Sequence, residues 1–203
     1  MWTRATGQWL TPSDGATWWF DSGSLALDFG YTGSIGHNPV WERWHSAHDM
    51  STWLSQRFGA PVSATADDLR TAKNLREAIA ALADDASAGR PLTISAVAVV
   101  DRVAAHPDLP PQLAGPVAPS VPTILSTLAR DAVAVFGDHP DRIRQCAADD
   151  CALIYLDTSR SGNRIWCSMQ RCGNRHKVRR LRARHRTPTS RTTAARPDHE
   201  GDL

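Results

Sequence analysis

The four cysteines of this 203-residue chain lie within 27 residues, at Cys146, Cys151, Cys167 and Cys172. They form two Cys-x4-Cys pairs separated by 15 residues, and each pair is close enough in sequence for both sulfurs to reach one ion about 2.3 Å away. Thiols crowded in this way are more typical of a metal site than of a disulfide framework. Because four thiolates complete the tetrahedral shell of Zn²⁺ and leave no position for a catalytic water, we expect one structural zinc ion.

The residues around the cysteines indicate how the ligands are held. Residues 152–157 (ALIYLD) are typical of a short strand, residues 158–163 of a turn, and residues 164–167 (RIWC) of a returning strand. Residues 174–186 contain neither Pro nor Gly, which predicts a helix that carries the last ligand at its start. The predicted core is too small to fold alone, so zinc would supply on the order of 10 kcal/mol. It comprises Leu153, Tyr155, Ile165, Trp166, Val178 and Leu181.

This predicted helix lies in the basic part of the chain. Residues 142–186 hold 12 Lys/Arg and 3 Asp/Glu, whereas residues 1–141 hold 9 and 15. On a helical wheel, Asn174, Val178, Leu181 and His185 share a narrow face that should pack on the hairpin, with cations on both flanks. Such cations can contact phosphate, and Arg can also read guanine in a major groove. The predicted nucleic-acid-binding residues are Arg175, Lys177, Arg179, Arg180, Arg182 and Arg184.

The same positive charge has two further interpretations. A zinc ion with four thiolates carries net negative charge, and nearby arginines would offset it. The remaining cations could dock the acidic residues 1–141 or another acidic protein surface. In that case the protein would be a zinc-stabilised interaction adaptor that does not bind nucleic acid.

The chain before the cysteines is predicted to be mainly helical. Apolar residues recur at helical spacing over residues 65–88, 93–105 and 123–136, and again over residues 41–58, where a break near Asp49 could allow Ser51 to cap a fresh helix. The proline-rich residues 106–122 are expected to form a loop, and residues 20–32 could be a short strand or a helical turn.

Several function classes lack their usual signatures in this sequence. There is no Gly-rich phosphate loop, no Ser nucleophile elbow and no apolar run long enough to span a membrane, so we expect a cytoplasmic protein that is not an enzyme. Most tryptophans lie within residues 2–53, where they could line a ligand pocket but more often fill a core. Asp28 could lie in such a pocket or could cap a helix.

Residues 142–186 resemble the CGNR zinc finger family. The stretches LDTSR (156–160) and WCSMQRCGNR (166–175) are similar to the pattern of that family. Its name describes the last zinc ligand and the three residues that follow it, which in this chain are Cys172, Gly173, Asn174 and Arg175.

Members of that family usually carry an N-terminal helical domain called ABATE. Residues 20–33 (FDSGSLALDFGYTG) are similar to its opening and residues 75–82 (LREAIAAL) to its central helix, although Gly30-Tyr31-Thr32 stands where an apolar residue, Asn and Thr are expected. The family is described as stress-induced transcription regulators. The resemblance therefore implies a zinc finger that binds DNA and an N-terminal domain that senses a small-molecule effector or forms a homodimer.

Together these observations predict a mainly α fold with four parts. A helical ABATE-like domain is followed by a small α+β, treble-clef-like zinc module built from a knuckle, a β-hairpin and a helix. The expected boundaries are an N-terminal extension over residues 1–19, the helical domain over 20–141, the zinc module over 142–186 and a disordered tail over 187–203.

Overall fold

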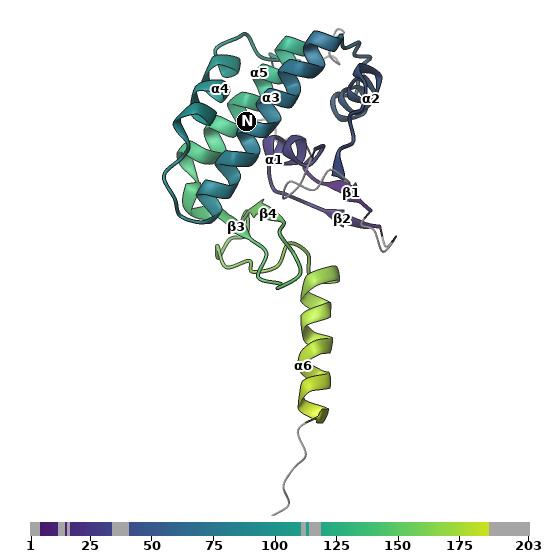
Figure 1. The fold of residues 1–203 in the computed structure, drawn as a ribbon, viewed down its shortest axis with the longest axis vertical. Coiled ribbons are helices and arrows are strands. Elements are labelled where there is room, and N and C mark those ends of the chain that lie inside the picture. Colours follow the sequence, from purple (N-terminus) through teal and green to yellow (C-terminus); the bar gives the residue numbers. More distant parts are fainter. Residues whose placement is uncertain are drawn as a thin grey trace, which may run out of the picture.

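The structure, a computed structural model, describes residues 5–11, 15, 17–33, 41–110, 113 and 119–186. Helices predominate over strands among these residues, which confirms the predicted mainly α fold. Figure 1 shows a helical body, a small region of strands and loops beside it, and helix α6 (Asn174–Arg186) projecting away from both. The tail predicted over residues 187–203 lies outside the described residues. No described helix is long and apolar enough to cross a membrane.

Three long helices form most of the body, and each lies close to its predicted position. They are α3 (Ala66–Ser87), α4 (Ile94–Ala104) and α5 (Val121–Asp138), and each packs against the other two. Helix α3 begins at a capping box in which Thr65 and Asp68 satisfy each other's backbone N–H groups. The expectation of a loop between α4 and α5 agrees with the described part of residues 106–120.

Two shorter helices precede this group. The ambiguous segment after residue 20 forms α1 (Leu25–Gly30), capped by Ser24, while α2 runs unbroken over Ala47–Phe58. The predicted break near Asp49 is therefore wrong. Asp49 instead completes a capping box with Ser46, and the Ser51 hydroxyl donates to the Ala47 carbonyl one turn earlier, within the helix.

The strands form two antiparallel pairs. In the first, β1 (Gln8–Leu10) pairs with β2 (Trp18–Phe20), with Trp9 opposite Trp19. In the second, β3 (Ile143–Gln145) pairs with β4 (Ile154–Leu156), so the predicted return strand over residues 164–167 is wrong. The cause is that the N-terminal part of the chain occupies the edge of β4 opposite β3. The Leu156 N–H donates to the Ser22 carbonyl, and the Tyr31 hydroxyl bonds to the backbone of Ile154.

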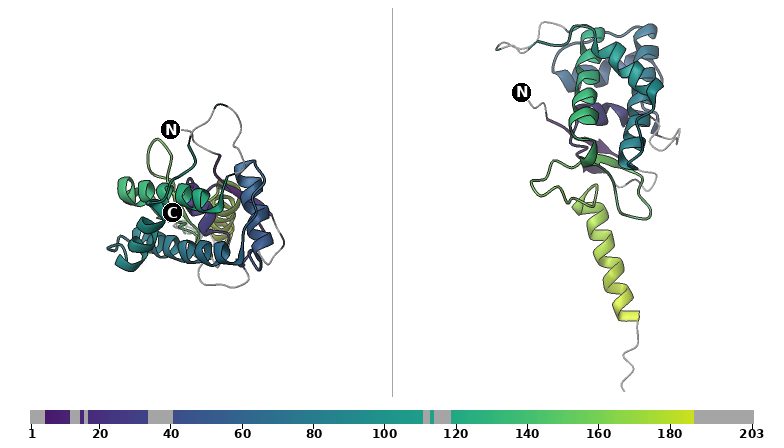
Figure 2. Two further views of the ribbon diagram at one scale, coloured as in Figure 1. Left: turned by 90° about the horizontal axis from the view of Figure 1, so that it is seen from above. Right: turned by 90° about the vertical axis from the view of Figure 1, so that its left-hand side faces the viewer.

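The β3–β4 pair shares a core with the helical body. Ile143, Ile154 and Leu156 are buried in the same apolar cluster as the residues of α1, α3 and α5, and both strands contact α3. The Tyr31 hydroxyl, just after α1, bonds to both the N–H and the carbonyl of Ile154. By contrast α6 has few contacts with elements other than the turn before it, and it extends from the body in Figure 1 and in the right-hand view of Figure 2.

Candidate metal centre and nucleic-acid interface

The structure brings the four predicted ligands together. Their sulfur atoms all lie within 4.8 Å of one another, with Cys151 Sγ 3.7 Å and Cys172 Sγ 3.5 Å from Cys167 Sγ. A tetrahedral Zn²⁺ with bonds of about 2.3 Å would hold its sulfurs about 3.8 Å apart. Cys146, Cys167 and Cys172 are buried and Cys151 is half-buried. The donor set and its spacing therefore fit a closed, four-coordinate metal site.

Different segments deliver the two pairs of ligands. Cys146 directly follows β3, and Cys151 lies in a turn before β4 in which its N–H donates to the Ala148 carbonyl. Cys167 donates its N–H to Cys146 Sγ over 3.4 Å. Cys172 lies in a single π-helical turn, Met169–Gly173, that leads into α6. The last ligand is thus at the start of the basic helix, as predicted.

The pKa values of these thiols show why a cation suits the site. The pKa of Cys146 is lowered to about 2 because the thiols of Cys151 and Cys167 donate to its sulfur. The pKa of Cys151 rises to about 12, since it serves as a donor to Cys146, and that of Cys167 is raised for the same reason. Four sulfurs at this spacing cannot all ionise unless a cation lies among them.

Two of the six predicted nucleic-acid-binding residues are engaged inside the module. Arg175 Nη2 donates to Cys172 Sγ over 3.2 Å, and this bond raises the pKa of Arg175. Arg175 Nη1 also lies 3.1 Å from Asp150 Oδ2, and Arg179 Nη2 lies 3.0 Å from the same oxygen. These contacts favour the interpretation that arginines near the centre offset the charge of the thiolates.

The other four predicted residues remain available. Side chains along α6 are exposed from His176 to Arg184, and no acidic partner within the described part of the chain pairs with Lys177, Arg180, Arg182 and Arg184. The predicted packing of this helix on the hairpin is wrong, because Val178 is 46 % exposed and Leu181 56 % exposed. Asn174, on the same predicted face, is also exposed, and its amide donates to the Gln170 carbonyl.

Two family models divide the chain. Residues 23–139 match the ABATE model, described as "Putative stress-induced transcription regulator". The chain belongs to the ABATE family. Residues 142–185 match the CGNR zinc finger, which confirms the resemblance and the order of the two parts. No curated protein matches the chain.

The N-terminal part of the chain supplies much of the core of the CGNR finger. A second apolar cluster joins Cys146, Cys167 and Cys172 to Leu10, Phe20 and Tyr31, with Leu153 and Tyr155 from the finger. These N-terminal residues fill the place that Val178 and Leu181 were predicted to take. Of the predicted core, Ile165 is also exposed, whereas Leu153 and Tyr155 are buried.

One sequence feature could have indicated this contact. Gly23 has a φ of +79°, and a Cβ there would lie 2.6 Å from the Leu156 carbonyl oxygen in β4. The Ser22 carbonyl accepts the Leu156 N–H over 2.8 Å. A glycine is therefore needed where the opening of the ABATE domain runs against the finger. The spacing of the cysteines alone contains no trace of this requirement.

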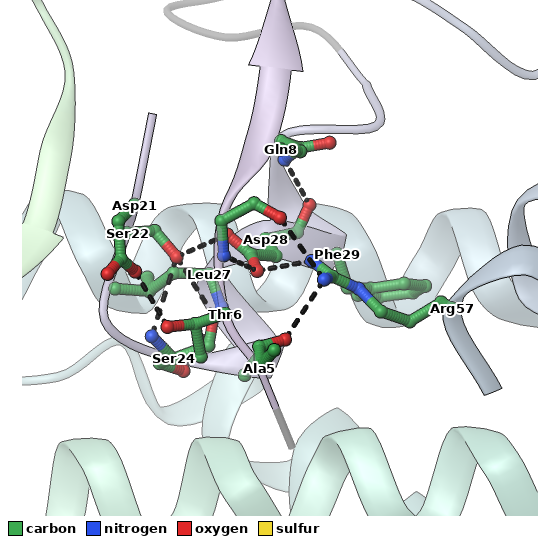
Figure 3. A network of polar contacts seen from close by, with 12 residues as sticks. Ala5, Thr6, Gln8, Asp21, Ser22, Ser24, Leu27, Asp28, Phe29 and Arg57 are labelled. Atoms are coloured by element: carbon green, nitrogen blue, oxygen red, sulfur yellow. Dashed lines mark hydrogen bonds and ion pairs between the residues drawn. The ribbon is translucent and has the colours of Figure 1, made fainter. Parts of the chain in front are cut away.

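The ABATE domain also contains a buried carboxylate, drawn in Figure 3. Asp28 accepts hydrogen bonds from the Gly7 N–H and the Ser22 hydroxyl, both 2.6 Å away, and pairs with Arg57 of α2. Burial raises the pKa of Asp28 to about 6, while the Ser22 hydrogen bond and the Arg57 charge act in the opposite direction. Neither predicted role describes it, because Asp28 connects β1 and α2 to α1 rather than capping a helix or lining a pocket.

Proposed function

We propose that this protein is a zinc-dependent transcription regulator without enzymatic activity, and that it binds DNA through α6. The observation that carries the proposal is an exposed 13-residue helix with four cations that lack acidic partners among the described residues. These outer cations are Lys177, Arg180, Arg182 and Arg184. At 1.5 Å per residue such a helix is about 20 Å long, and a major groove about 12 Å wide admits it. Arginine and lysine on its surface would neutralise phosphates and release counterions.

One structural zinc ion would set the position of this helix. Cys172 fixes the turn before α6 to the knuckle that holds Cys146 and Cys151, so the metal determines where the helix leaves the module. When bound, zinc supplies the charge that lets all four sulfurs ionise and the free energy that so small a fold requires.

The ABATE domain would regulate the finger by binding an effector or by forming a homodimer. Two direct connections support a route between them: the Tyr31 hydroxyl bonds to Ile154, and both β3 and β4 contact α3. A change in the packing of the helices would therefore reach the strands that flank the first two cysteines.

Salt dependence of binding tests the DNA contact. We expect the full-length zinc-loaded protein to bind a short mixed-sequence duplex, with a slope of about −4 for log affinity against log salt if four cations contact phosphate. The double variant Arg180→Ala/Arg184→Ala should reduce this slope by about 2 and weaken binding at least about tenfold at low salt. The matched control Arg70→Ala/Arg102→Ala removes the same charge from exposed positions on α3 and α4. Equal affinity of the two double variants would refute the proposal.

A second candidate is a zinc-stabilised adaptor that binds acidic proteins. Its support is that the finger packs on the N-terminal part of the chain through apolar residues. The outer cations of α6 therefore have no acidic partner among the described residues and could bind an acidic protein surface. Fluorescence anisotropy separates the candidates, since an adaptor would show no α6-dependent affinity for the duplex.

A further inference from the structure

A groove of about 670 Å³ lies between the β1–β2 hairpin and the basic helix. One wall comes from the segment that precedes the ABATE match, with Thr17 directly before β2 and Trp18 as the first residue of β2. The other comes from the finger, with Arg171 in the turn before α6 and with Asn174, Val178 and Arg182 along the helix. Figure 1 shows the hairpin on the side of the body from which α6 projects. The groove therefore includes side chains from the N-terminal hairpin and from the CGNR finger.

The chemistry of the groove suits an anion that also has apolar parts. The Arg171 guanidinium lies over the Trp18 ring, 3.8 Å from its centroid, so the hairpin holds this cation at the wall. Val178 adds an exposed apolar surface, and Arg182 adds a cation with no ion pair to any described residue. No acidic side chain in the described part of the chain lines the groove.

The length of the groove favours a polymer over a small ion. Within α6 the groove runs from Asn174 to Arg182, which are eight residues or about 12 Å apart at 1.5 Å per residue, and Arg171 lies in the turn before the helix. Phosphates repeat along each DNA strand, so more than one phosphate fits along this span. The apolar surfaces of Trp18 and Val178 suit the deoxyribose between phosphates.

We propose that the β1–β2 hairpin is a second DNA-binding surface, and that one sugar–phosphate backbone of the duplex runs in the groove between Trp18 and α6. This inference rests on the proposed function, in which α6 lies in the major groove of DNA. The N-terminal hairpin then directly contacts the DNA strand that borders this groove, and duplex recognition requires the hairpin and the finger to keep their relative position.

Charge changes at Thr17 test this surface without altering α6. Thr17 is exposed, and its only described side-chain contact is with the Thr11 hydroxyl, 3.0 Å away, so substitution should leave the fold intact. In the full-length zinc-loaded protein, Thr17→Glu should weaken duplex affinity at least about tenfold. Thr17→Lys should strengthen it and steepen the salt slope by about 0.9. Thr71→Glu and Thr71→Lys, at an exposed position on α3, are the matched controls.

The outcomes separate this inference from the proposed function. One outcome is that the Thr17 variants bind the duplex with the same affinity as the corresponding Thr71 variants while Arg180→Ala/Arg184→Ala weakens binding. In that case the groove does not hold DNA although α6 does. If the unmodified protein does not bind the duplex, both proposals fail. Thermal melting of all four variants by circular dichroism shows whether an affinity change reflects unfolding. The Lys variant gives a gain that unfolding cannot produce.

Discussion

Arg175 is the third residue after the last cysteine, and its guanidinium donates to Cys172 Sγ over 3.2 Å. Arg175, which is the R in the name CGNR, therefore faces the metal centre. Its Nε is buried without a hydrogen-bond partner among the described residues, so the side chain is directed inward and only part of it reaches solvent. This geometry assigns Arg175 first to the metal site and only second to the surface of α6.

Replacing Arg175 should therefore affect metal retention. Groups that hydrogen-bond to metal ligands contribute about 10- to 100-fold to metal affinity, so Arg175→Ala should lose zinc to a chromophoric chelator at a correspondingly lower chelator concentration. The control is Arg180→Ala, which removes the same charge from an exposed position one helical turn and a half away. Identical zinc affinity of the two variants would contradict the assignment.

Asp150 should weaken DNA binding in the unmodified protein. Its Oδ2 lies 3.1 Å from Arg175 and 3.0 Å from Arg179, so it competes with phosphate for both guanidinium groups. We expect Asp150→Asn to increase duplex affinity several-fold and to steepen the salt slope by about 1 to 2. Asp149→Asn changes net charge equally at a neighbouring exposed carboxylate without an ion pair among the described residues, and should have a smaller effect.

Much of the local structure follows directly from the sequence. Thr65 and Asp68 mark the start of α3 in their sequence spacing, and the two Cys-x4-Cys pairs predict the ligand cluster that the structure shows. Such features depend on residues close in sequence, and the physics of a capping box or of a tetrahedral ion fixes their geometry.

The wrong predictions concern contacts between residues that are distant in sequence and strands that are too short to recognise. Residues 143–145 (IRQ) have no strand signature, so the sequence favours residues 164–167 as the partner of β4 instead. The contact between Tyr31 and Ile154 spans 123 residues and replaces the predicted packing of Val178 and Leu181. No local pattern contains that information, because it arises from the way two modules bury a common surface.

Tyr31 should contribute strongly to stability through that contact. Its buried hydroxyl accepts the Ile154 N–H over 2.6 Å and donates to the Ile154 carbonyl over 2.7 Å. Tyr31→Phe leaves two buried backbone groups unpaired, and we expect a loss of about 2 to 4 kcal/mol in the free energy of unfolding by urea. Tyr155→Phe is the comparison, since that hydroxyl makes one described bond, to the Arg164 carbonyl. A smaller loss for Tyr31→Phe than for Tyr155→Phe would contradict this role.

Metal removal should unfold the finger before the helical body. Chelation leaves four crowded thiols without their cation, whereas the apolar core of α3, α4 and α5 contains none of the cysteines. Hydrogen exchange should show lost amide protection over residues 146–186 and retained protection in the three long helices. The variant Cys167→Ser should reproduce this pattern without chelator. Persistent protection of α6 in the metal-free protein would show that zinc does not position the helix.

The buried carboxylate of Asp28 should make stability depend on pH. Its pKa is about 6 in the folded protein, compared with 3.8 for an aspartate in water, so the folded state holds the proton more tightly. The stabilisation is fully present below pH 3.8 and is lost as pH rises through about 6; a difference of about two pKa units corresponds to about 3 kcal/mol.

The difference between the unmodified protein and Asp28→Asn isolates this contribution, because titration of other groups cancels. We expect the unmodified protein to lose stability relative to the variant between about pH 4 and pH 7, by on the order of 3 kcal/mol in urea unfolding. Asp21→Asn, which removes an exposed carboxylate of the same network and leaves Asp28 in place, is the comparison variant. If the stability difference stayed constant over this range, Asp28 would be ionised throughout. The Arg57 ion pair would then outweigh the effect of burial, and the link between β1, α1 and α2 would be a permanent salt bridge.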